Sequence, residues 1–251
     1  MPSKSSPLDV LPTSLLKFCS ATFSVIIADL ANMMFRTGQF PNRFETAQIM
    51  PLLKNNGLYL TSPASYRPVS NLNTTSKVLE RLILSRITAH LDASGLVDCL
   101  QSAYRKCHST ETALLRITDD VYRAFDADQS VIVVALDLSA AFDCTDHSIL
   151  ISRLQYTYSF GGHVLDLIKS YLSGGSSFVK WIDTTSECSA VDIGVPQGTS
   201  LSPLLFSMYI LPLVTKMRSF GVMYHQYADD TQIYIVFFKS RLYNVQIKML
   251  E

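Results

Sequence analysis

The sequence has few cysteines and no excess of charge of either sign. Its five cysteines are odd in number, are widely spaced and form no CxxC pair. This excludes a disulfide framework or a zinc site built on cysteine pairs, and it favours a reducing, intracellular compartment without choosing between nucleus and cytoplasm. The 21 basic and 21 acidic side chains cancel, whereas nucleic-acid enzymes are often basic.

Long uninterrupted hydrophobic runs are also absent. Asp29 and Asn32 interrupt the apolar stretch 18–35, and two prolines interrupt the stretch 201–214. Because a membrane-spanning helix needs about 20 predominantly apolar residues, we expect no membrane association. Internal repeats, low-complexity segments and targeting signals are likewise absent. With 48% hydrophobic and 17% charged residues, the chain has the composition of a folded globular protein.

The charges are unevenly distributed along the chain. From Lys54 to Lys106 there are seven basic and three acidic residues, and from Asp126 to Asp146 there are five aspartates and no Lys or Arg. Such a division suits a protein that holds phosphates with one part and cations with another. The alternative is two ordinary solvated faces, and the charge pattern by itself favours that alternative.

The periodicity of apolar residues predicts interleaved helices and strands, and hence a sheet covered by helices. The continuous, β-branched run 131–136 predicts a strand buried on both faces. Pro212 is expected to kink or end its helix. The expected helices are 14–35, 76–91, 110–126, 146–154, 164–172 and one starting near Pro203, and the expected strands are 45–54, 131–136, 177–182, 188–195, 221–227 and 231–238.

Two aspartate features can carry chemistry. Asp137 ends the apolar strand, and the pair Asp229-Asp230 lies at the tip of the last hairpin. Carboxylates that are brought together repel each other unless a cation neutralises them, and Mg²⁺ takes one or two carboxylates plus substrate phosphates. The alternative is that each aspartate only caps a turn. Spacing alone does not show that the two features meet.

The chain resembles the reverse transcriptases of non-LTR (LINE-type) retrotransposons from about residue 8 to residue 238. The resemblance depends on six motifs in the family's order. They are PLLK (51–54), YRPVS (66–70), QSAYRK with HSTETAL (101–114), ALDLSAAFD (135–143), GVPQG (194–198) followed by SPLLF (202–206), and YADD (227–230).

This resemblance implies an α+β right-hand polymerase with fingers and a ferredoxin-like palm sheet packed by helices. The thumb is expected to be missing, because family likeness stops soon after YADD. The implied organisation is an N-terminal helical extension (1–35), fingers (36–126), a palm (127–238) with boundaries interleaved, and a divergent tail (239–251). The implied activity is RNA-directed DNA polymerisation by two-metal phosphoryl transfer.

The resemblance also assigns roles to individual residues. Structural alternatives stay open for three of them: Phe142 could be core, Arg67 a surface residue and Gln197 part of a turn. The implied catalytic residues are Asp137, Asp229 and Asp230, with Leu138 added as a metal ligand. Lys54, Arg67, Phe142 and Gln197 are the implied nucleotide-binding residues, and Gly194, Pro196, Gly198 and Tyr227 are the implied template–primer residues.

The implied cofactor is a pair of Mg²⁺ ions, with Mn²⁺ as a substitute. The implied partners are an RNA template, a DNA primer and deoxynucleoside triphosphates, while protein partners are undefined. The family usually has glycine where this chain has Ser202 and Cys107. Two further hypotheses are a catalytically inactive remnant that at most binds RNA, and a polymerase or splicing-associated relative of another palm lineage. Phe142 and the stretch 101–114 argue against an RNA-copying RNA polymerase.

Overall fold

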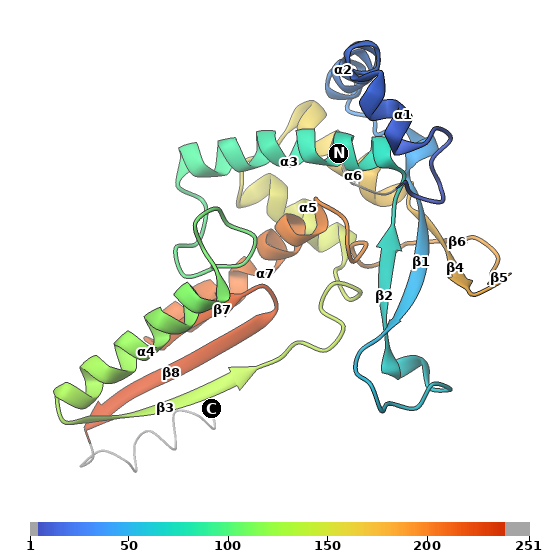
Figure 1. The fold of residues 1–251 in the computed structure, drawn as a ribbon. Coiled ribbons are helices and arrows are strands. Elements are labelled where there is room, and N and C mark those ends of the chain that lie inside the picture. The colour runs from blue at the N-terminus through green and yellow to red at the C-terminus, as the bar shows by residue number, and fades with distance from the viewer. Residues whose placement is uncertain (1–4, 239–251) are drawn as a thin grey trace. The chain divides into compact units, whose positions relative to one another are not determined.

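The computed structural model describes residues 5–238, which form two compact units. The first unit contains the chain up to Leu96 and the stretch Phe142–Tyr209. The second unit contains Val97–Ala141 and, among the described residues, Ile210–Phe238. Each unit is therefore built from two separate stretches of sequence, coloured by residue number in Figure 1. The expected divergent tail, 239–251, lies outside the described residues.

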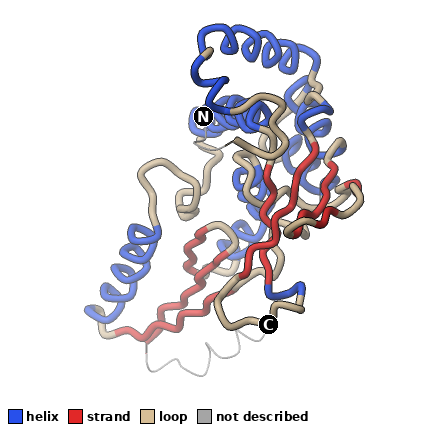
Figure 2. The backbone as a smooth tube through the Cα atoms, turned by 45° about the vertical axis from the view of Figure 1, so that its right-hand side comes forward, coloured by secondary structure: helices blue, strands red, loops and turns tan. Residues whose placement is uncertain are grey.

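The first unit contains a mixed five-stranded sheet with the order β2-β1-β4-β5, in which β6 also pairs with β4. Strand β1 runs antiparallel to β2 and parallel to β4, and Figure 2 shows these strands in red. The strands are β1 (Thr46–Leu53), β2 (Tyr66–Asn71), β4 (Ser176–Trp181), β5 (Thr184–Thr185) and β6 (Ser189–Ala190).

Helices pack together in the first unit, with α6 against both α2 and α5. The carboxylate of Glu80, on α3, is buried and accepts hydrogen bonds from the Tyr171 hydroxyl (2.6 Å) and the Ser200 N–H (2.9 Å). It therefore ties α3 to α6. The helices are α1 (Thr13–Phe18), α2 (Ser20–Thr37), α3 (Thr74–Ser94), α5 (His147–Tyr156) and α6 (Gly162–Ser173), with 3₁₀ turns η1 (Asn42–Phe44) and η2 (Pro63–Ser65).

The second unit contains an antiparallel three-stranded sheet with the order β3-β8-β7. Helix α4 packs against β3 and β7, and it starts with a capping box formed by Ser109 and Thr112. The end of α7 contributes Val214 and Met217 to a buried apolar cluster with Tyr224. The elements are α4 (Thr110–Asp126), β3 (Gln129–Leu136), β7 (Met223–Tyr227) and β8 (Asp230–Phe238), together with the part of α7 (Ser202–Ser219) from Ile210 onward.

The sequence predicted that Pro212 would kink or end its helix. Helix α7 does not end there but continues to Ser219. Proline has no N–H to donate to the carbonyl four residues earlier, which here belongs to Met208. That carbonyl instead accepts a hydrogen bond from the Tyr158 hydroxyl at 3.4 Å. The next carbonyl, of Tyr209, accepts one from the Arg153 guanidinium. Side chains from outside the helix thus satisfy the acceptors around the proline.

Three further expectations were wrong in detail. Strand β3 is not buried on both faces, because Val133 and Leu136 are 48% and 40% exposed and α4 packs on the sheet from one side. The expected strand 188–195 shrinks to the two residues of β6, and Gly194, near the end of the expected range, has a positive φ that does not fit a strand. The expected helix 14–35 is divided at Cys19. Within residues 5–238, no helix has the length and apolar character needed to cross a membrane.

Glu45, just after η1, is a buried carboxyl whose Oε1 atom has no hydrogen-bond partner among the described residues. It lies against Gly174, where an added Cβ would come within 1.7 Å of Oε2. Burial raises the pKa of Glu45 from 4.5 to about 7. Since folding favours the protonated form, this carboxyl lowers the stability of the fold progressively as the pH rises from 4.5 through 7.

Glu45→Gln should therefore raise the melting temperature at pH 8 and change it little at pH 4.5, because glutamine mimics the protonated acid. Thermal denaturation followed by circular dichroism at both pH values measures this difference. Glu187→Gln, at an exposed position of the same unit, is the matched control and should show no such pH dependence. An equal shift at both pH values for Glu45→Gln would contradict the prediction.

Candidate functional site

The three predicted catalytic aspartates lie at one end of the second unit's sheet, which we call the acidic end. Leu136 of β3 pairs with Thr231 of β8, and Asp137 follows directly after β3. Asp230 is the first residue of β8 and pairs with Tyr227 of β7. Continuing the register by one residue sets Asp137 opposite Asp230, and Figure 1 shows β3 ending beside the start of β8. Asp229 lies between β7 and β8, in the turn.

The acidic end is accessible to solvent. Asp137 and Asp230 are exposed, and Asp229 is half-buried. Tyr104 lies nearby: burial and then the negative charge of Asp229 raise the pKa of its hydroxyl. The sequence had identified Tyr104 only as part of a family motif, so its place beside the aspartates is a finding of the structure.

The oxygen donors of the acidic end fit a hard divalent cation in type. Within the part of the chain that the structure describes, no group of three or more His, Cys, Asp or Glu side chains is close enough together to hold a metal ion. Mg²⁺ is usually bound by one or two carboxylates, with substrate phosphates and water completing its shell. The aspartates therefore suit a metal site that is completed by substrate, to which Leu138 could offer only its backbone carbonyl.

The two predicted phosphate-binding residues lie together in the first unit. Arg67 of β2 pairs with Leu52 of β1, so both side chains lie on one face of the sheet. Lys54 directly follows β1, and its N–H donates to the Ser65 carbonyl at 2.9 Å, so it lies at the same end of the strand pair. Both Lys54 and Arg67 are exposed. The structure thus brings two cations, 13 positions apart in sequence, to one end of the β1–β2 pair.

The predicted glycine loop, 194–198, is held in the first unit by backbone hydrogen bonds on both sides. Gly194 N–H donates to the Thr145 carbonyl (2.8 Å), and Val195 N–H donates to the Phe142 carbonyl (2.9 Å). On the other side, Ser70 N–H donates to the Gln197 carbonyl at 2.7 Å. The loop therefore connects the segment after Phe142 with strand β2.

Gly194 is required by both conformation and space. Its φ is 89°, and an added Cβ would lie 2.9 Å from the carbonyl oxygen of Asp143. Gly198 also has a positive φ, 98°. The roles that the sequence assigned to these glycines, close approach of the backbone to nucleic acid, stay predictions. What the structure adds is a structural reason for glycine at position 194.

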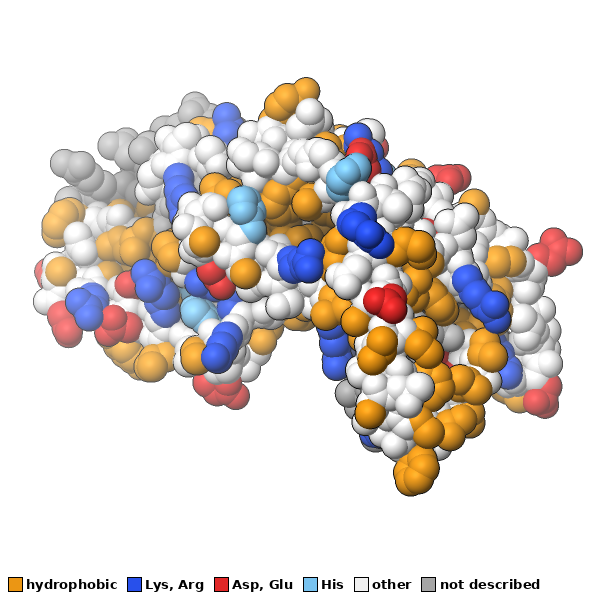
Figure 3. All heavy atoms as spheres, turned by 90° about the horizontal axis from the view of Figure 1, so that it is seen from above, with side chains coloured by type: hydrophobic (Ala, Val, Ile, Leu, Met, Phe, Trp, Pro, Cys, Tyr) orange, Lys and Arg blue, Asp and Glu red, His pale blue; other side chains and the backbone are white. Residues whose placement is uncertain are grey.

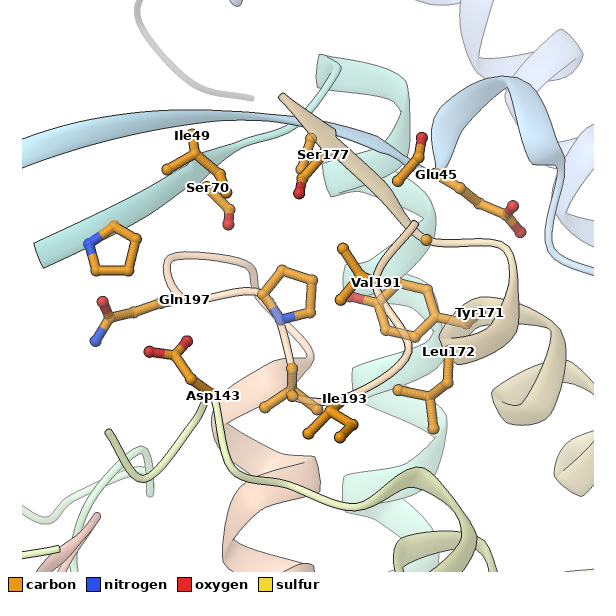
Figure 4. Close-up of a pocket in the computed structure, with 17 residues that line it drawn as sticks. Glu45, Ile49, Ser70, Asp143, Tyr171, Leu172, Ser177, Val191, Ile193 and Gln197 are labelled. Carbon is orange, nitrogen blue, oxygen red and sulfur yellow. The ribbon is translucent and has the colours of Figure 1, made fainter. Parts of the chain in front are cut away.

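A pocket of about 110 Å³ lies beside this loop. Gly194, Pro196 and Gln197 line it together with Asp143. In Figure 4, the Asp143 carboxylate and the Gln197 amide lie at one end of the pocket, and Glu45 lies at the other. Burial raises the pKa of Asp143. The pocket therefore presents a carboxyl and an amide at one end of an otherwise largely apolar wall.

Phe142 and Tyr227 are less accessible than Asp137 and Asp230. The Phe142 ring is 9% exposed and stacks on Phe206 of α7, with 4.8 Å between the ring centroids. Much of the ring is therefore used in core packing, as the structural alternative had proposed, and contact with a sugar stays a prediction. Tyr227 is half-buried at the end of β7.

Basic side chains do not gather into one continuous field on the face of the molecule in Figure 3, where Lys and Arg are interspersed with acidic and apolar side chains. This distribution agrees with the zero formal net charge. On this face, phosphate binding would therefore depend on single cations or local pairs of cations rather than on a broad basic surface.

Comparison with known proteins gives a family match over most of the chain. Residues 52–250 match the family described as reverse transcriptase (RNA-dependent DNA polymerase). The chain is 31% identical, over 85% of its length, to the probable RNA-directed DNA polymerase from transposon BS of Drosophila melanogaster. It is 29% identical, over 92% of its length, to the RNA-directed DNA polymerase from mobile element jockey of Drosophila funebris. It spans 23% and 26% of these two relatives.

Solved structures show the same fold at low sequence identity. A truncated apo telomerase from Candida tropicalis matches with a TM-score of 0.60 and 13% identity, over 91% of this chain and 52% of that one. Telomerase from Candida albicans, solved with a fragment of telomeric RNA, matches with a TM-score of 0.58 and 14% identity, over 85% of this chain and 40% of that one. The predicted α+β polymerase fold is thereby confirmed.

Gly194→Ala should destabilise the first unit more than Gly95→Ala does. Both glycines have positive φ, but an added Cβ at Gly95 would meet nothing within 4 Å. Backbone strain should lower the free energy of unfolding by about 1 kcal/mol in Gly95→Ala. In Gly194→Ala the steric clash adds to this strain, and the loss should be at least about 2 kcal/mol. Urea denaturation of both variants measures the difference, and equal losses would rule out the clash.

Cys107→Gly should stabilise the second unit. Cys107 is exposed and has a φ of 62°, in the left-handed region, at the position where the family usually has glycine. The free energy gained by relieving the backbone strain should exceed the cost of the extra conformational entropy that glycine gives the unfolded chain. The net gain should be roughly 0.5–1 kcal/mol. Cys99→Gly, at an exposed residue without a positive φ, should be destabilising. If urea denaturation showed both variants to be weakened alike, the strain argument would be wrong.

Proposed function

The chain belongs to the reverse transcriptase (RNA-dependent DNA polymerase) family. We propose that it catalyses the RNA-templated addition of deoxynucleotides to the 3′-hydroxyl of a DNA primer. The observation that carries the proposal is the acidic end: Asp137, Asp229 and Asp230 all lie at the same end of the β3-β8-β7 sheet. The chain spans less than a quarter of the curated relative from transposon BS, so the activity of a complete relative is part of the proposal.

In this proposal the palm is residues 127–238, and the acidic end of the second unit is its catalytic centre. Asp137 and Asp229 would hold divalent cations through their carboxylates, Leu138 would add its carbonyl, and Asp230 would support them from the start of β8. Two Mg²⁺ ions, or Mn²⁺ in their place, would supply an activated primer hydroxyl and a counter-charge for the α-phosphate. The accessibility of the acidic end supports this, because substrate phosphates must reach it to complete the metal shell.

The first unit would bind the incoming deoxynucleoside triphosphate. Arg67 suits a phosphate through two parallel hydrogen bonds and Lys54 through a point charge. Their position at the same end of the β1–β2 pair supports this role. Gln197 and the backbone of Gly194, Pro196 and Gly198 would contact the template or nucleotide, while Phe142 would exclude a 2′-hydroxyl by its bulk.

Primer extension tests the proposal. The 251-residue chain would receive a poly(rA) template, an oligo(dT) primer, dTTP and Mg²⁺ or Mn²⁺. We expect extension by the wild type, and a loss of about 10²- to 10³-fold in Asp137→Asn, because the carboxylate acts on charge that develops during the reaction. Chelation of the divalent ions should abolish extension.

Asp126→Asn is the matched control, since it removes the same charge from the last residue of α4, at the other end of β3 from Asp137. It should extend primers like the wild type. Extension by Asp137→Asn at the wild-type rate would contradict the proposed role of the acidic end. A folded wild type that binds template–primer without extending it would favour the inactive, RNA-binding alternative.

A further inference from the structure

Residues 100–102 form an additional edge on the hairpin that carries the aspartates. Gln226 N–H, on β7, donates to the Leu100 carbonyl at 2.9 Å, and Ser102 N–H donates to the Gln226 carbonyl at 3.0 Å. Gln101 therefore pairs in parallel with Gln226. Gln101 and Ser102 begin the family motif 101–114, to which the proposed mechanism assigns no role.

The Gln101 side chain reaches the turn that contains Asp229. Its Oε1 atom accepts hydrogen bonds from the N–H groups of Ala228 (3.1 Å) and Ala103 (3.0 Å), and its Nε2 atom donates to the Ala228 carbonyl (3.4 Å). Gln101 and Ala228 are 6% exposed. One amide thus holds both backbone polar groups of Ala228, and two N–H donors on one atom fix which end of the amide is oxygen.

Ala228 needs such support because its backbone is strained. It is the first residue of a two-residue hairpin turn and has a φ of 60°. Two-residue hairpin turns usually place Gly, Asn or Asp where φ is positive. Alanine has a Cβ, unlike glycine, and no polar side chain that could form a local hydrogen bond to offset the cost of the positive φ. Without the Gln101 amide, the buried Ala228 N–H would lose its hydrogen bond to Oε1. The strained conformation of the turn would then lose the hydrogen bonds that stabilise it.

Gln101 is itself held firmly by its surroundings. The Arg105 guanidinium donates to the carbonyls of Asp98 and Gln101, each at 2.9 Å. The Asp98 carboxylate accepts from the Tyr224 hydroxyl (2.9 Å) and the Arg218 guanidinium (3.0 Å). The segment 98–105 is therefore a fixed support for the amide, not a loose loop.

The direction of Asp229 depends on this turn and not on a strand. Asp137 directly follows β3 and Asp230 begins β8, and both strands are paired, so the pleat of the sheet orients these two side chains. Asp229 follows Ala228 within the turn, and a rotation about the Ala228 backbone would carry its carboxylate away from Asp137. We propose that Gln101 is a positioning residue that holds the strained turn so that the Asp229 carboxylate faces the metal site.

The claim that this carboxylate then binds metal depends on the proposed function, whereas the claim that Gln101 holds the turn can be tested without it. In the metal-free, ¹⁵N-labelled 251-residue protein, amide hydrogen exchange would be measured for Ala228 and Gln226. Gln101→Met keeps the length of the side chain and removes its hydrogen bonds. We expect exchange at Ala228 to become about tenfold faster, with Gln226 unchanged because its partner is the Leu100 backbone.

Two variants accompany this measurement. Gln129→Met makes the same change in the same sheet, at the end of β3 farthest from Asp137, and should leave exchange at Ala228 unchanged. Gln101→Glu keeps an acceptor for both N–H groups and should give intermediate exchange, and it replaces Gln101→Met if the latter does not fold. If the Ala228 amide exchanged at the wild-type rate in the Gln101 variant that folds, the proposal would be overturned.

Binding of Mn²⁺, measured by calorimetry, tests the consequence for the metal site. Gln101→Met should bind Mn²⁺ about tenfold more weakly. Adding Ala228→Gly should restore much of the affinity, because glycine adopts the positive φ without strain. A general packing role for Gln101 would not be repaired by a change at residue 228. Weakened binding without this rescue would overturn the positioning role.

If the wild type neither binds Mn²⁺ nor extends a primer, the proposed function fails, and exchange at Ala228 still decides whether Gln101 holds the turn. If the wild type does both and Gln101→Met does so equally well, the proposed function stands and the positioning role is overturned. The two failures are therefore distinguishable.

Discussion

The register of strand β8 is the constraint on which the acidic end depends. Strand β8 pairs with β3 on one side and with β7 on the other, so the end of β3, the start of β8 and the turn before it share one edge of the sheet. A slip by one residue would turn every side chain of β8 to the opposite face and separate Asp230 from Asp137. The position of the carboxylates is thus a consequence of strand pairing.

The first unit depends on close backbone contact in the same way. The loop 194–198 donates hydrogen bonds to the segment after Phe142 and accepts one from β2. Only a residue without a Cβ fits at Gly194, because the Asp143 carbonyl lies against it. The glycines of this loop therefore have a structural purpose that precedes any contact with nucleic acid, and substitution there would change the fold of the loop before it changed binding.

Much of this arrangement could be predicted, because its signals are local. The two apolar runs 221–227 and 231–238 predicted the hairpin, and the order of the motifs predicted the family. Other features depend on contacts that one sequence does not contain. Helix α7 passes Pro212 because Tyr158 supplies a donor to a freed carbonyl. Gln101 supports a turn 127 positions away. No periodicity or propensity encodes a side chain that satisfies a distant backbone.

The most direct test of the central claim is a titration of the ¹⁵N-labelled protein with Mn²⁺, which broadens the amide signals of residues near its binding site. If the sheet register and the turn bring the carboxylates together as described, the signals of Asp137, Asp229 and Asp230 should broaden first, at the lowest Mn²⁺ concentrations. Broadening that begins elsewhere, or that spreads evenly over all exposed carboxylates, would contradict a metal site at the acidic end.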